Sequence, residues 1–112
     1  MRVVVTYDNG NVGQHFGETE AFKIYDIEND TVTKSEIIST NGRGHRELIP
    51  VVAGFKPDTV ICGGVGTPMV DAVTGLGATM YTGITGDADA AVASLIAGTL
   101  ASDPDAVHSC SH

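Results

Sequence analysis

Residues 57–73, PDTVICGGVGTPMVDAV, combine a short apolar run, a glycine-rich turn and the start of a helix. Residues 59–62 are apolar or β-branched, which predicts a strand buried on both faces. The glycine-rich residues 63–66 end that strand, Thr67 is a good N-cap, and Pro68 suits the first helical turn. A buried strand that leads directly into a helix indicates parallel strands joined by right-handed crossovers.

The residues before this segment predict three further strands. Residues 3–7 form a second apolar, β-branched run, which ends at the turn signal Asp-Asn-Gly. Residues 22–27 and 31–38 predict the two strands of a hairpin, with a turn at residues 28–30 between them. An antiparallel hairpin beside parallel strands makes a mixed sheet.

The rest of the chain alternates between helices and strands. A helix is predicted at residues 45–55, although Pro50 suits a first turn better than an interior, and a short strand at residues 79–81. Asp87 is placed to cap a final helix that Gly98 ends. We therefore expect an α/β protein with a mixed sheet, helices packed on that sheet, and the element order β-β-β-α-β-α-β-α.

The length of 112 residues allows one hydrophobic core and is too short for two. We predict one α/β domain over residues 1–100 and a flexible tail over residues 101–112. No apolar run approaches the roughly 20 residues that a membrane span needs, and no signal peptide is evident. A cytoplasmic protein without membrane contact is therefore expected.

The charge balance is acidic, with 14 Asp and Glu against 6 Lys and Arg. Such a chain repels a phosphate backbone, so nucleic-acid binding is not expected. Two of the six basic residues, Arg43 and Arg46, nevertheless flank His45, which concentrates positive charge there. The two cysteines, Cys62 and Cys110, lie far apart and form no Cys-x-x-Cys pair, so neither a disulfide nor a zinc site is indicated.

The glycine-rich turn consists of Gly63, Gly64, Val65 and Gly66. Between a strand and a helix N-terminus, its N–H groups and the helix dipole favour an anionic ligand. The alternative is a tight turn in which glycine is needed for close packing. Met69 stands where a dinucleotide fingerprint requires a small residue, and no Gly-Lys pair marks a P-loop, so NAD and ATP are weak candidates.

Three side chains near this turn in the predicted topology are candidate metal ligands: His15, His45 and Cys62. Arg43 and Arg46 are placed to offset the negative charge of a sulfide cluster. The simpler explanation is that His15 caps a loop and His45 caps a helix.

The tail supplies a second candidate site, because alternate residues of an extended segment point the same way. Its three candidate metal ligands are His108, Cys110 and His112. A terminus without regular structure is the competing interpretation.

Catalysis finds little support. Asp8, Asp26 and Asp71 loosely follow the pattern of two-metal nucleases, but the chain lacks the basic surface that a nuclease needs. No Ser-His-Asp or Cys-His arrangement is evident. The chain also offers no convincing nucleophile for an enzyme that acts on an anionic metabolite. We expect a protein that is not an enzyme.

Several motifs in one order resemble a known family. They are His15-Phe16-Gly17, Phe22-x-Ile24-Tyr25-Asp26, His45, residues 60–66, residues 75–78 and residues 81–83. Over roughly residues 1–100 they resemble the dinitrogenase iron–molybdenum cofactor biosynthesis proteins. That family includes the NifX and NafY type of carriers, the C-terminal domain of NifB-type proteins and small stand-alone members such as the orange proteins.

The resemblance implies a ribonuclease-H-like fold without the nuclease carboxylates. It also implies noncovalent holding of an anionic iron–sulfur or molybdenum-containing cluster, or of a molybdenum–copper sulfide as in orange proteins. Cluster donor and acceptor proteins would be its partners. The alternative is a regulatory module that holds no cofactor and acts with an associated ATPase.

The family's site residues carry over unevenly. His15 and His45 fall on recurring histidine positions, residues 63–66 on the glycine turn, and Cys62 where stand-alone members often have cysteine. The tail beyond Leu100 is variable in the family, so its histidines and cysteine inherit no role.

Overall fold

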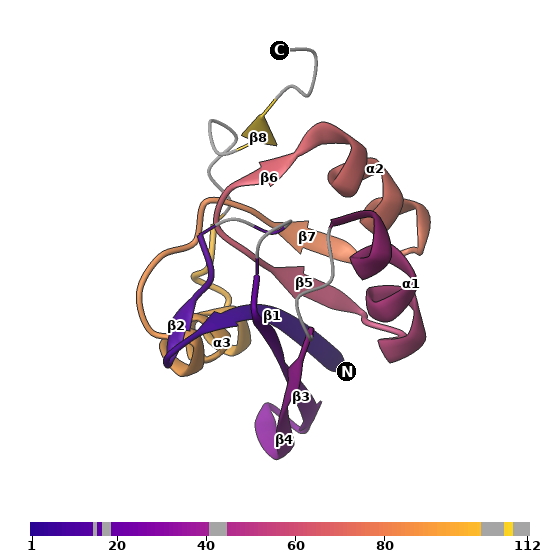
Figure 1. Ribbon diagram of the computed structural model, residues 1–112. Helices are drawn as coiled ribbons and strands as arrows, with labels where there is room; N and C mark the ends of the chain where they lie inside the picture. The colour runs from indigo at the N-terminus through magenta and orange to yellow at the C-terminus, as the bar shows by residue number, and fades with distance from the viewer. Residues whose placement is uncertain (15, 17–18, 41–44, 102–106, 109–112) are drawn as a thin grey trace.

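The computed structural model describes residues 1–14, 16, 19–40, 45–101 and 107–108, with backbone alone at 45–49 and 107–108. It contains a mixed sheet and three helices in that described part (Figure 1). The longer elements are β1 (Arg2–Asp8), β3 (Ala21–Glu28), β4 (Thr31–Ser39), α1 (His45–Phe55), β5 (Thr59–Ile61), α2 (Thr67–Gly75), β7 (Thr79–Tyr81) and α3 (Ala88–Ala97). The expected mixed α/β architecture is confirmed. Three two-residue strands were not predicted: β2 (Asn11–Val12), β6 (Val65–Gly66) and β8 (Val107–His108).

The main sheet has the strand order β4-β3-β1-β5-β7, with β2 paired to β1. The neighbours β4, β3 and β1 are antiparallel, whereas β1, β5 and β7 are parallel. Val4 lies at the centre, opposite Ile24 on one side and Val60 on the other. None of the helices in the described ranges has the length and apolar character needed to cross a membrane.

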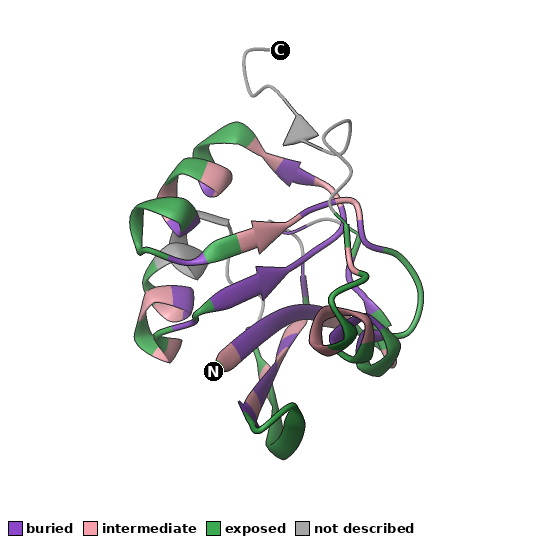
Figure 2. Ribbon diagram, turned by 180° about the vertical axis from the view of Figure 1, so that it is seen from behind, coloured by how far each residue is buried: buried purple, intermediate pink, exposed green. Residues whose placement is uncertain are grey.

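The core lies on both faces of this sheet. Val3, Val4 and Val5 are fully buried, as the continuous apolar run predicts. Val4 and Val60 belong to a cluster that α1 and α2 cover, whereas Val3 and Val5 belong to one that α3 covers. Strand β4 is the exception, because it is an edge strand that is exposed along nearly its whole length (Figure 2).

Two of the predicted helix signals are wrong in detail. Gly66, not Thr67, is the N-cap of α2, and no side chain caps that helix start. Pro50 lies inside α1 rather than in its first turn. The helix continues to Phe55 because Val52 and Phe55 pack on the core, which outweighs the local cost of proline. Asp87, in contrast, caps α3 as predicted by accepting from the Asp89 N–H.

On the α3 face, the Tyr25 hydroxyl donates to Asp89 Oδ1 at 2.5 Å. Burial and this hydrogen bond raise the pKa of Tyr25 above its ordinary value of 10.0. The protonated Tyr25 hydroxyl therefore stabilises the folded protein fully below pH 10, and this stabilisation is lost as the pH rises above 10. We expect Tyr25→Phe to lower the unfolding free energy by about 1–2 kcal/mol at neutral pH and to weaken its alkaline pH dependence. Urea denaturation at neutral and alkaline pH tests this. If the unfolding free energy of Tyr25→Phe fell with alkaline pH as steeply as that of the wild type, the expectation would be contradicted.

Candidate functional site

The glycine turn lies at the carboxyl edge of the sheet, between the loops that follow β2 and β7. The Gly63 N–H donates to the Gly13 carbonyl at 3.0 Å, and the Gly64 N–H donates to the Gln14 carbonyl at 2.6 Å. On the other side, the Gly83 N–H donates to the Gly63 carbonyl at 2.9 Å. Backbone hydrogen bonds therefore hold three loops together where ligands of open α/β sheets bind.

Part of the glycine turn serves packing. A Cβ added at Gly63 would lie 2.7 Å from Gln14 Cα and 2.8 Å from the Gly13 carbonyl oxygen. Only glycine fits this approach, so the packing explanation holds at this position. Because the N–H groups of Gly63 and Gly64 already bind carbonyls, neither is available to an anion without a rearrangement.

The end of the turn is paired with the C-terminal segment. Strand β6 pairs in parallel with β8, so that Val65 lies opposite Val107 and Gly66 opposite His108 (Figure 1). The segment predicted to be a flexible tail thus contains two residues beside the glycine turn. The other tail candidates, Cys110 and His112, lie outside the described residues.

The helix starts share this edge. The carbonyl of Phe55, at the end of α1, accepts from Arg2 at the start of β1. The end of α1 therefore lies at the amino edge of the sheet, and His45, its first residue, lies toward the carboxyl edge (Figure 1). The side chains of His45 and Arg46, and all of Arg43, lie outside what the structure describes.

His15 also lies outside the described residues, but both of its chain neighbours are placed. The Gln14 carbonyl accepts from the Gly64 N–H, and the Phe16 N–H donates to the Gly64 carbonyl at 3.0 Å. Gly64 is therefore bound on both sides by the residues that flank His15. This contact was missed because it joins segments far apart in the sequence, and no local pattern reports it.

Cys62 lies inside the core rather than at the edge. Its side chain is fully buried in the cluster under α1 and α2, and its Sγ lies 3.6 Å from the Tyr81 carbonyl oxygen. Burial raises the pKa of the thiol to about 12. A protonated, enclosed thiol is a poor metal ligand, so the geometry does not support this candidate.

This burial gives a measurable expectation for Cys62. In a Cys110→Ser variant, Cys62 should react with a thiol reagent at least about a hundredfold more slowly in the native protein than in denaturant. The reason is that burial restricts access and lowers the thiolate fraction together. Stopped-flow labelling at neutral pH measures both rates, and rapid native labelling would contradict the placement.

The candidate nuclease carboxylates do not converge. Asp8 ends β1 opposite Asn11, whereas Asp26 lies opposite Arg2 at the other end of the same strand. Across the described ranges, no three His, Cys, Asp or Glu residues are grouped so that they could hold a metal ion. Only the backbone of His45 and of His108 lies within the described part of the chain.

The sequence matches the family described as "Dinitrogenase iron-molybdenum cofactor" over residues 1–98. The chain belongs to this family. Membership confirms the resemblance drawn from the motif order and connects the chain with iron–molybdenum cofactor biosynthesis.

Similar proteins agree in extent and fold. The uncharacterized protein MJ0580 of Methanocaldococcus jannaschii is 25% identical over 105 residues, which are 89% of each chain. The crystal structure of PH0822 has a TM-score of 0.86 and 27% identity, covering 95% of this chain and 97% of that one. The apo form of the orange protein from Desulfovibrio gigas shares the fold, with a TM-score of 0.78, 20% identity and 92% coverage of both chains.

Proposed function

We propose that the protein binds and carries an anionic metal–sulfur cluster at the carboxyl edge of its sheet, without catalysing a reaction. The cargo would be an iron–molybdenum cofactor precursor or a molybdenum–copper sulfide. The observation that carries the proposal is the convergence on Gly64 of the two residues flanking His15, next to the start of α2. The ribonuclease-H-like arrangement implied by the resemblance belongs to the same proposal.

The start of α2 supplies the attraction for an anion. No side chain caps this helix, and its first turn contains no acidic residue. The partial positive charge of the helix N-terminus is therefore not offset locally. Gly66, the N-cap residue, has no side chain to exclude a large cluster from the helix start.

The remaining donors come from histidine and arginine. We propose His45 and His15 as metal ligands, with Arg43 and Arg46 offsetting the cluster charge. The pairing of Gly66 with His108 favours a second arrangement, in which the tail residues His108, Cys110 and His112 complete or replace that ligand set. Cluster donor and acceptor proteins, and an associated ATPase, would be the partners.

Anaerobic titration of the apo protein with tetrathiomolybdate, with and without copper or iron, tests the function. After desalting, visible spectra and metal analysis are compared for the wild type, His45→Ala and a chain ending at Leu100. A stoichiometric chromophore that persists in the shortened chain and weakens in His45→Ala would support the site on the domain. If the chromophore is lost only in the chain that ends at Leu100, the binding site lies on the tail. No retention in any form would favour the cofactor-free regulatory module.

A further inference from the structure

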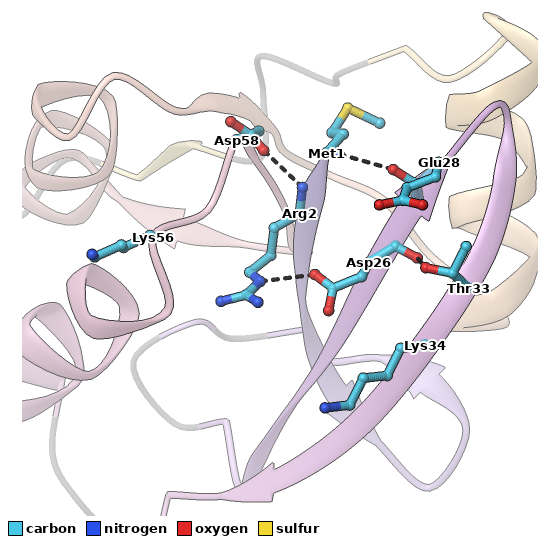
Figure 3. A pocket seen from close by; sticks show the side chains of 9 residues that line it. Met1, Arg2, Asp26, Glu28, Thr33, Lys34, Lys56 and Asp58 are labelled. Atoms are coloured by element: carbon cyan, nitrogen blue, oxygen red, sulfur yellow. Dashed lines mark hydrogen bonds and ion pairs between the residues drawn. The ribbon is translucent and has the colours of Figure 1, made fainter.

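A pocket of about 530 Å³ lies at the opposite edge of the sheet (Figure 3). Its walls are the start of β1, the end of β3, the start of β4 and the turn between α1 and β5. The seven-residue strand β1 separates it from the glycine turn by about 20 Å. It is therefore distinct from the proposed cluster site, and it is a wide, open hollow with room for a small molecule.

The pocket gathers an unusual share of the positive charge. Three of the chain's six basic residues, Arg2, Lys34 and Lys56, line it, although the chain has a net charge of −8. In the view of Figure 3 the Arg2 guanidinium lies between the two lysine ammonium groups. These residues come from β1, β4 and the turn after α1, so only the fold brings them together.

The acidic residues of the pocket are largely engaged by Arg2. The Arg2 Nε donates to Asp26 Oδ1 at 2.9 Å, and the Arg2 main-chain N–H donates to Asp58 Oδ2 at 2.7 Å. In contrast, within the described ranges no hydrogen bond or ion pair holds the ammonium group of Lys34 or Lys56. The guanidinium of Arg2 neutralises Asp26, but the main-chain N–H that holds Asp58 carries no charge. Lys34, Lys56 and the terminal ammonium group of Met1 therefore stand against Asp58 and Glu28, which leaves a small positive excess in the pocket.

Lys56 also occupies a backbone conformation that favours glycine. Its φ of 53° lies in the left-handed region, directly after α1, where a glycine would end the helix at lower cost. A lysine held there costs about 1 kcal/mol relative to glycine. Strain of this kind is retained most readily where the side chain has a function, and here that side chain lines the pocket.

We propose that this pocket binds a small phosphorylated metabolite. Lys34, Lys56 and the one guanidinium nitrogen of Arg2 that bonds neither Asp26 nor Phe55 contact its phosphate group, because separate cationic donors suit a dianion with several oxygens. Glu28 accepts hydrogen bonds from hydroxyl or amino groups on the rest of the ligand.

Titration of the ¹⁵N-labelled protein with ribose 5-phosphate and with inorganic phosphate, at constant ionic strength, tests this proposal. Saturable shifts are expected at the amides of Arg2, Glu28, Lys34, Lys56 and Asp58. Ribose 5-phosphate is expected to bind more tightly than phosphate alone. The absence of saturation, or equal affinity for both probes, would overturn the proposed ligand class.

Two variants distinguish a specific binding site from general electrostatic attraction. Lys56→Gly and Lys34→Gln should each weaken binding by about tenfold, the loss of one charge-assisted contact. Lys56→Gly also relieves the backbone strain, so a folding defect would not explain weaker binding by this variant. Lys23→Gln removes the same charge on the α3 face, where Lys23 pairs with Asp89, and should change the affinity less than about twofold. Equal weakening by Lys23→Gln, or unchanged binding by Lys56→Gly, would overturn the site.

Discussion

Gly63→Ala is expected to lower the free energy of unfolding by about 2–3 kcal/mol, because the close approach of two loops leaves no room for a methyl group. The new Cβ would lie 2.7 Å from Gln14 Cα and 2.8 Å from the Gly13 carbonyl oxygen. Both are backbone atoms, so relief requires the loop to move. That movement would break the hydrogen bonds to Gly63 and Gly64.

Gly54→Ala is the matched control for this substitution. Gly54 is exposed inside α1, and a Cβ there meets no atom within 4 Å. Alanine should therefore raise the unfolding free energy by about 0.5–1 kcal/mol through its helix propensity. Urea denaturation of both variants measures the difference. Similar effects of the two substitutions would contradict the proposed packing of the glycine turn.

Phe22→Ala is expected to cost about 3–5 kcal/mol, the range for removing a fully buried aromatic side chain. Phe22 has no exposed area, and its ring packs edge-on against Phe16 at 5.8 Å and Phe55 at 5.9 Å between centroids. The substitution therefore leaves a cavity between β3, α1 and the loop that carries the proposed site. Val32→Ala, on the exposed edge strand β4, should stay within about 0.5 kcal/mol of the wild type.

Thermal and urea melts of these two variants provide the comparison. The Phe22→Ala protein is expected to unfold well before the wild type, whereas the Val32→Ala protein should match it. A loss below about 1 kcal/mol for Phe22→Ala would mean that the core closes around the missing ring, contrary to the tight packing found here.

Local patterns accounted for the fold because its core strands carry continuous apolar runs. Val3, Val4 and Val5 had to be buried on both faces, which requires helices on both sides of the sheet. Asp87 and Gly98 marked the ends of α3 through capping chemistry that depends only on nearby residues. The prediction for Pro50 was wrong because the packing of α1 on the core outweighs the local cost of a proline inside a helix.

The sites were harder to predict because they depend on contacts between distant segments. The glycines at 63–66 were compatible with either anion binding or close packing. Only the close approach of Gln14 shows that packing requires the glycine at position 63. Cys62 matched a family position, yet its place in the core follows from the pairing of β5 between β1 and β7. The cluster of Arg2, Lys34 and Lys56 has no sequence signature, because three separate segments supply it.

The most direct test of the carrier account is an amide NMR map of the apo protein during anaerobic addition of tetrathiomolybdate and copper. The account predicts slow-exchange changes centred on Gly64, Gly66 and Met69, at the carboxyl edge, with Arg2 and Lys56 unaffected. No changes, or changes centred on Arg2 and Lys56 at the amino edge, would contradict a cluster site at the glycine turn.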